Sequence, residues 1–203
     1  MKKILIILVL FALIGCKKDK DESQTVTDID GNKYGVVTID AQTWMTENLR
    51  VTKYNNGDPI PNVTDGTKWK NLITGAYCDY NNNVDNVKEY GRLYNWYTIS
   101  DTRGLAPKGW HVATNADWQT LINFYGGKTN AGCELKKPVF NAVASVMRYS
   151  DGTFTLISDI GTIGHWWAST NLEHYYMYFN GVCAVDNKIA DKIYGFPVRC
   201  IKE

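Results

Sequence analysis

The chain has 203 residues, 44% of them hydrophobic, which is enough to bury the core of one large domain. Its 22 Lys and Arg residues almost balance its 21 Asp and Glu residues, so the net charge is only +1. Proteins that bind nucleic acids usually carry a basic surface that neutralises phosphates. The charge balance therefore excludes nucleic acid as an expected partner.

The first 15 residues have the layout of a secretory signal peptide. Two lysines follow Met1, residues 4–14 are uncharged and apolar, and a glycine stands directly before Cys16. Residues 13–16 resemble the lipobox of bacterial lipoproteins, and this resemblance implies that a diacylglycerol is attached to Cys16 and that the chain is cleaved before it. The apolar run is shorter than the roughly 20 residues of a membrane-spanning helix. A retained transmembrane helix and an ordinary secretory signal are the alternatives.

Residues 16–27 are expected to form a flexible tether. Residues 17–22 are all charged, and no apolar residue follows until Val26, so the segment has nothing to bury. The cluster of lysines and acids resembles the surface-export signals of lipoproteins in the Bacteroidota. We therefore expect an outer-membrane lipoprotein of the cell envelope that is displayed at the cell surface. Its expected partner is the membrane, to which the lipid anchor attaches it. The folded domain is expected to span residues 28–203.

Strand signals lie at both ends of this domain. Residues 34–51 alternate as a pair of strands does, and they follow a favoured turn sequence at residues 30–31. Two hairpins are predicted over residues 146–157 and 175–185, the second around an Asn-Gly turn. A last strand is predicted over residues 193–201.

Two helices are predicted between these strands. Aromatic and aliphatic side chains recur with helical spacing in residues 88–100, which predicts one helix there. A second helix is predicted after Thr114, because Asp117 completes a capping box and a glycine pair ends the pattern at residues 126–127. Residues 55–66 contain the turn formers Asn, Pro and Gly and are expected to be loop. The order of elements indicates an α+β fold with antiparallel sheets.

Seven motifs occur in order along the chain, at residues 30–34, 42–49, 77–81, 90–97, 105–112, 166–170 and 198–200. Together they closely resemble the Fibrobacter succinogenes major paralogous domain, which is found in exported lipoproteins. The resemblance covers residues 28–202 and departs at residues 135–165, where the family usually carries a longer segment. It implies a C-type-lectin-like fold with two main α-helices. It implies little about activity, because one fold hosts many functions.

Four cysteines remain after Cys16, and cysteines of exported proteins usually form disulfides. The sequence allows three pairings, and buried free thiols are the alternative. Cys78 and Cys200 lie within motifs that resemble the family, whereas Cys133 and Cys183 do not. On this ground we expect the disulfides Cys78–Cys200 and Cys133–Cys183.

One loop has the ligand spacing of a calcium site. Asp79, Asn81, Asn83 and Asp85 stand at positions 1, 3, 5 and 7 of an oxygen-rich loop. The glycine expected at position 6 and the glutamate expected at position 12 are missing, so an ordinary Asn-rich turn is the favoured interpretation. Calcium is therefore a weak candidate, and no other metal or cofactor is expected.

No catalytic residue stands out. His111, His165 and His174 lack metal-ligand spacing, and the chain has neither a nucleophile motif nor a phosphate-binding glycine loop. We therefore do not expect an enzyme.

Aromatic residues are the remaining signal for binding. Trp166 and Trp167 are adjacent, so on a strand they face opposite sides. We expect one ring to be buried and the other to be exposed as a ligand-binding candidate. The predicted function is a non-enzymatic, lipid-anchored module that binds a glycan or another surface macromolecule. A structural or assembly component with a protein partner is the alternative, and an uncharacterised hydrolase is the third possibility.

Overall fold

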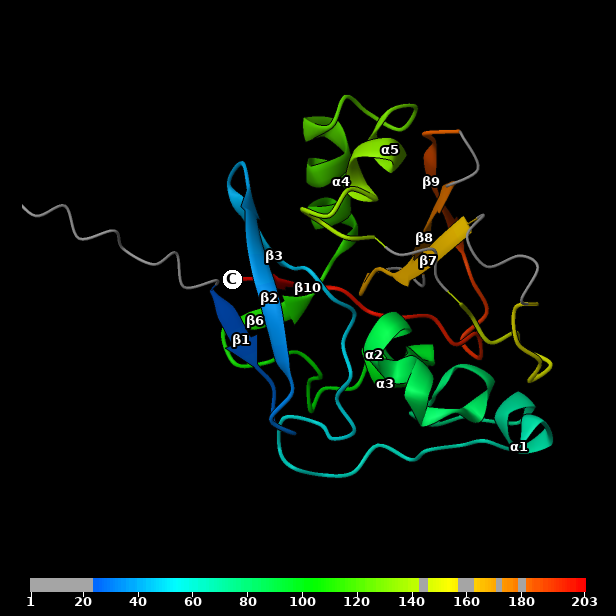
Figure 1. The fold of residues 1–203 in the computed structure, drawn as a ribbon. Coiled ribbons are helices and arrows are strands. Elements are labelled where there is room, and N and C mark those ends of the chain that lie inside the picture. The colour runs from blue at the N-terminus through cyan, green and yellow to red at the C-terminus, as the bar shows by residue number, and fades with distance from the viewer. Residues whose placement is uncertain (1–23, 143–145, 157–162, 171–172, 179–181) are drawn as a thin grey trace, which may run out of the picture.

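The computed structural model describes residues 24–142, 146–156, 163–170, 173–178 and 182–203. Within these residues the chain forms a mixed α/β fold with three antiparallel sheets and a few short helices (Figure 1). The predicted signal peptide and Cys16 lie outside the described residues. The antiparallel α+β class is confirmed.

The largest sheet has five strands in the order β1-β2-β3-β10-β6. The strands are β1 Thr25–Thr27, β2 Lys33–Ile39, β3 Gln42–Met45, β6 Trp110–Val112 and β10 Cys200–Lys202. The C-terminal strand lies between β3 and β6, so this sheet joins the two ends of the domain (Figure 1). The predicted strand pair is confirmed as β2 and β3, with Val37 opposite Trp44.

Strand β1 shows that the predicted tether is too long at its C-terminal end. Val26 pairs with Tyr34 of β2 and packs against the core, because it is the first apolar side chain after the charged run. The turn that follows is confirmed. The Asp28 carboxylate accepts hydrogen bonds from the backbone N–H groups of Asp30 and Asn32 and thereby holds the turn closed.

Two smaller sheets complete the strands. One pairs β4 Tyr77–Cys78 with β5 Leu93–Tyr94. The other has the order β7-β8-β9, and its strands are β7 Ile163–Trp167, β8 Glu173–Tyr178 and β9 Val185–Ile189. The predicted hairpin over residues 175–185 is only partly correct: β8 and β9 do pair antiparallel, but β9 covers Val185–Ile189, so only Val185 of the predicted second strand belongs to it. Its Asn-Gly turn lies outside the described residues.

The other two strand predictions are only partly correct. In the predicted hairpin over residues 146–157, of which residues 146–156 are described, a Tyr149 N–H···O=C Thr153 bond of 2.8 Å closes a turn, but Arg148 and Phe154 form only an isolated bridge. The strand predicted over residues 193–201 is wrong before residue 200. The backbone of residues 193–199 instead forms hydrogen bonds with several separate segments. For example, Phe196 bonds to β5 and Pro197 bonds to β7.

Helix α4, Asn115–Phe124, confirms the better-signalled helix. The Thr114 side chain accepts from the Asp117 N–H and the Asp117 side chain accepts from the Thr114 N–H, which is the predicted capping box. Its buried face includes Trp118, whose ring lies 5.1 Å from the Trp44 ring on β3. The other helices have four or five residues: α1 Gly66–Lys70, α2 Val87–Tyr90, α3 Trp96–Ile99 and α5 Ala131–Leu135. The 3-10 turns are η1 Tyr80–Asn82 and η2 Val84–Asn86.

The single helix predicted over residues 88–100 is wrong. Strand β5 separates α2 from α3, and Gly91 leaves the helix with φ 73° and ψ −164°. A Cβ atom at this position would lie 2.5 Å from the Cβ of Asn48, so the chain passes too close to the 48–49 segment for another residue. Helix α3 then starts anew, with the Asn95 side chain accepting from the Thr98 N–H. The expectation of two main helices therefore fails, because α4 is the one long helix in the part of the chain that the structure describes.

Candidate functional site

The two adjacent tryptophans face opposite sides of β7, as predicted, but neither is exposed. Both side chains have 0% exposure. Trp166 packs against Trp118 of α4, and Trp167 packs against Phe196 at 4.7 Å between ring centroids. The expectation that one of these rings contacts a ligand is wrong, because each face of the strand is covered.

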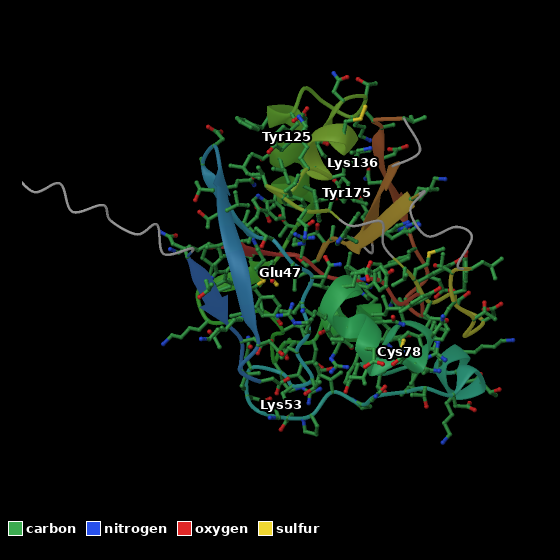
Figure 2. All side chains as sticks on the ribbon, in the orientation of Figure 1. Glu47, Lys53, Cys78, Tyr125, Lys136 and Tyr175 are labelled. Atoms are coloured by element: carbon green, nitrogen blue, oxygen red, sulfur yellow. A yellow bond between two sulfur atoms is a disulfide. The ribbon has the colours of Figure 1, made fainter. Side chains whose placement is uncertain are left out.

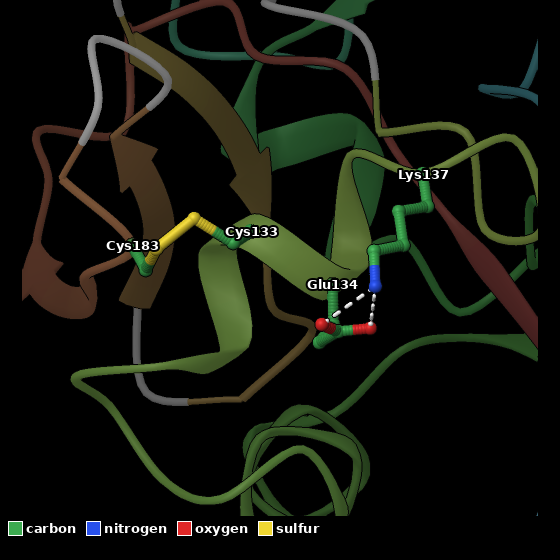
Figure 3. Close-up of a disulfide and its surroundings, with 4 residues drawn as sticks. All are labelled: Cys133, Glu134, Lys137 and Cys183. Carbon is green, nitrogen blue, oxygen red and sulfur yellow. Dashed lines mark hydrogen bonds and ion pairs between the residues drawn. A yellow bond between two sulfur atoms is a disulfide. The ribbon is translucent and has the colours of Figure 1, made fainter.

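The cysteine prediction is half correct. The Cys133–Cys183 disulfide is confirmed and joins α5 to the residues before β9 (Figure 3). Cys78 and Cys200 are instead free, buried thiols, and the predicted bond between them is wrong. Cys78 lies among the short helices (Figure 2) in a different hydrophobic cluster from Cys200. Burial raises the pKa of Cys78 to about 12, so the thiol stays protonated.

The loop with calcium-like spacing does not bring its four candidate ligands together. The Asp79 carboxylate points inward and pairs with Arg92, whereas Asn81, Asn83 and Asp85 are exposed. The Asn83 side chain accepts from the Asp85 N–H at 3.0 Å, as in an ordinary Asx turn. In the described part of the chain no group of three or more His, Cys, Asp or Glu residues could hold a metal ion.

The structure brings together two histidines that the sequence left apart. His165 on β7 pairs with Tyr176, and His174 on β8 pairs with Trp167, so the two histidines are diagonal neighbours on one face of the sheet. Their ring centroids lie 5.5 Å apart. His111 lies elsewhere, on β6, within 2.9 Å of the Asp117 carboxylate. The sequence could not predict that His165 and His174 meet, because their contact depends on the register between β7 and β8.

The histidine pair belongs to a cavity of about 270 Å³, here named the β7–β9 pocket. The rings of His165 and His174 stack on Phe196 at centroid distances of 5.5 and 4.6 Å. Tyr194 stacks on the same phenylalanine at 5.5 Å, and Tyr149 meets Tyr194 edge to face at 6.2 Å. The cavity is lined by Tyr149, His165, His174, Lys188, Tyr194 and Phe196, with Met147 and residues 189–191 completing it. Half of its ten lining residues are therefore aromatic.

The floor of the β7–β9 pocket is uncharged at neutral pH. Burial is the main cause that lowers the pKa of His165 to about 3 and that of His174 to about 4. A neutral imidazole has one N–H donor and one acceptor nitrogen. Lys188, opposite His174 on β9, is exposed. The site can therefore stack against an apolar surface and offer hydrogen-bonding groups close by.

A larger depression of about 470 Å³ lies elsewhere, beside the turn after β1. Its lining includes Asp28, whose carboxylate already accepts hydrogen bonds from the Tyr34 hydroxyl at 2.6 Å and from the Asn32 side chain at 2.8 Å. These hydrogen bonds occupy much of the capacity of the Asp28 carboxylate to accept hydrogen bonds from a ligand. The β7–β9 pocket is therefore the better candidate, although it is smaller.

Comparison with known families identifies the chain. A family model described as the Fibrobacter succinogenes major domain matches residues 37–202, which is most of the 203 residues. The chain belongs to this family. The Fibrobacter succinogenes major domain includes every strand from β3 to β10, and the β7–β9 pocket lies inside it.

No curated protein and no solved structure matches this Fibrobacter succinogenes major domain protein. The family resemblance expected from the seven motifs is confirmed.

Among the residues that the structure describes, no helix is long and apolar enough to span a membrane.

Proposed function

We propose that the protein is a non-enzymatic binding module that takes a sugar ring of a glycan in the β7–β9 pocket. The aromatic lining of this cavity is the observation that carries the proposal. A sugar ring has C–H groups on its faces and hydroxyl groups around its edge. The half-buried Tyr149 and Tyr194 rings offer apolar area for the ring face, and the neutral imidazoles and Lys188 offer partners for hydroxyl groups.

The size of the pocket suits a small group. At about 270 Å³ it lies just below the range of roughly 300–1,000 Å³ typical of sites for drug-sized ligands. A single sugar ring at the end or side of a glycan matches this size better than a long segment of polymer.

Replacement of Tyr194 by alanine is expected to lower glycan affinity at least about tenfold, which corresponds to about 1.4 kcal/mol of lost stacking. The purified protein is screened on an array of neutral and acidic oligosaccharides, and dissociation constants are measured for the sugars that bind. Phe124→Ala is the matched control, because this side chain is aromatic, 54% exposed and located on α4 outside the pocket. Equal affinity of Tyr194→Ala and wild type would contradict the proposed site.

Failure of every oligosaccharide to bind the wild type would contradict glycan recognition itself. That result would favour the structural or assembly role, which a pull-down of envelope proteins tests. Release of reducing sugar from any oligosaccharide on the array would favour the third possibility, that the protein is a hydrolase.

We also propose that Cys16 carries a lipid that anchors the protein to the outer membrane at the cell surface. Support comes from the lipobox-like residues 13–16 and the charged run after them. Two or more acyl chains suffice for stable membrane attachment. Cys16→Ser is expected to move most of the protein from the membrane fraction to the aqueous fraction after cell lysis. Unchanged partitioning of this variant, with Cys78→Ser as the control, argues against the anchor.

We further propose that the fold is C-type-lectin-like. The first and last strands of the domain share one sheet, α4 packs against that sheet, and a smaller sheet forms within the long segment between α4 and β10. An experimental structure compared with C-type-lectin-like domains tests this assignment.

A further inference from the structure

Strand β9 is an edge strand that supplies one side of the β7–β9 pocket. The sheet order β7-β8-β9 leaves β9 with β8 as its one neighbour within this sheet. Lys188 and Ile189 at its end, and Ala190 and Asp191 directly after it, line the cavity. The position of β9 therefore sets the width of the pocket.

The open side of β9 is held by residues 128–133, which run from the loop after α4 into the first turn of α5. The Val185 N–H donates to the Lys128 carbonyl at 2.7 Å, and the Gly132 N–H donates to the Cys183 carbonyl at 2.8 Å. The Lys128 ammonium lies 2.8 Å from the Asp186 carboxylate. The Cys133–Cys183 disulfide joins the same two segments covalently (Figure 3).

The disulfide is the strongest of these connections. Lys128 and Asp186 are about half exposed, and ion pairs of this kind contribute little because water and salt screen them. The two backbone hydrogen bonds persist only while the segments stay together. The disulfide keeps them together, since it closes a loop with a sequence separation of 50 residues.

We propose that the Cys133–Cys183 disulfide positions β9 and thereby determines the ligand affinity of the β7–β9 pocket, so that thiol reductants weaken binding. This inference rests on the proposed function of the pocket. A small dithiol supplies two electrons and two protons, the S–S bond breaks, two cysteine thiols form, and the dithiol is oxidised to its own disulfide.

Among the described residues, Cys133–Cys183 is the one disulfide that a reductant can break. Cys133 and Cys183 are half-buried and within reach of a small thiol. Cys78 and Cys200 are fully buried, and burial raises the pKa of both thiols, so neither supplies the thiolate that disulfide exchange requires. Reoxidation by a small disulfide, which accepts the two electrons and two protons and becomes a dithiol, therefore restores the original pairing instead of a scrambled one.

The test compares the wild type with the double variant Cys133→Ser/Cys183→Ser, and the wild type with and without dithiothreitol. Hydrogen exchange of residues 185–189, followed by mass spectrometry, reports the order of β9 without any ligand. We expect exchange there to become at least about tenfold faster when the bond is absent, a change of about 1.4 kcal/mol in opening free energy. Unchanged exchange of β2 and β3 shows that the rest of the fold is intact.

Lys137→Ala is the matched control. Lys137 pairs with Glu134 on α5, next to the disulfide but directed away from β9 (Figure 3), and its loss is expected to leave β9 exchange unchanged. On the oligosaccharide array, the reduced protein and the double variant are expected to bind at least about tenfold more weakly than the wild type.

Two outcomes overturn the inference: β9 exchange that does not respond to loss of the disulfide, and array binding that stays at the wild-type level although β9 exchanges faster. If no oligosaccharide binds the wild type, the proposed function fails, whereas faster exchange of β9 still supports the positioning role of the disulfide. The two failures are thus distinguishable.

Discussion

Replacement of Arg199 by alanine is expected to destabilise the protein by about 3–5 kcal/mol. The Arg199 side chain has 0% exposure and donates to four oxygen atoms. These are the carbonyls of Met45 at 3.0 Å, Phe140 at 2.9 Å and Asn141 at 3.3 Å, and the side-chain oxygen of Asn48 at 3.1 Å. Alanine removes every donor and leaves the buried Met45 and Phe140 carbonyls without this partner, which costs more than the loss of the hydrogen bonds alone.

The guanidinium group links segments that are far apart in the sequence. Burial lowers the pKa of Arg199 to about 9, so the group is still charged at neutral pH and makes strong, charge-assisted hydrogen bonds. Lysine has three donors on a single nitrogen and cannot reproduce the planar arrangement of the guanidinium donors. Arg199→Lys is therefore expected to remain clearly destabilised.

Thermal and urea unfolding measure this effect. For a chain of this size the expected loss corresponds to a melting temperature lower by roughly 10 °C. Lys202→Ala is the control, because this nearby side chain on β10 is exposed and its loss should stay within about 0.5 kcal/mol of the wild type. Stability of Arg199→Ala within about 1 kcal/mol of the wild type would show that the buried hydrogen bonds do not form.

Trp166→Ala and Trp167→Ala are both expected to destabilise the fold by about 3–5 kcal/mol, because each leaves a large cavity in the core. Each indole also donates a buried hydrogen bond, from Trp166 to the Asn48 side chain at 2.8 Å and from Trp167 to the Tyr94 carbonyl at 2.7 Å. The two substitutions open cavities on opposite faces of β7, in separate hydrophobic clusters.

Urea denaturation of both variants checks this expectation. Phe124→Ala serves again as a control, since its ring is 54% exposed and little packing is lost with it. If one tryptophan variant kept nearly wild-type stability while the other unfolded, one of the two rings would be exposed in solution and would return as a ligand-binding candidate.

Elements with complete local signals were predictable. Helix α4 formed as expected because its capping box, its buried stripe and its terminating glycines all lie within about 14 consecutive residues. Strands β2 and β3 were predictable for the same reason, since both the alternation and the turn at residues 30–31 before it are encoded nearby. The ordered motifs likewise identified the family, which needs no three-dimensional information.

Contacts between distant segments decided the rest. Gly91 breaks a helical pattern because Asn48, more than 40 residues earlier, lies against it. Alternation along β7 correctly placed Trp166 and Trp167 on opposite faces, but the chain's later return through Phe196 determined that the second face is covered as well.

The binding site shows the same division. The sequence by itself determined the family, the antiparallel α+β class, α4 and the pairing of β2 with β3, because these depend on residue types and short spacings. The tertiary structure alone decided which cysteines lie close enough to bond, which tryptophans are buried, and that His165 and His174 meet at the β7–β9 pocket. These outcomes depend on strand register and on long-range packing, and a residue's local sequence carries little information about either.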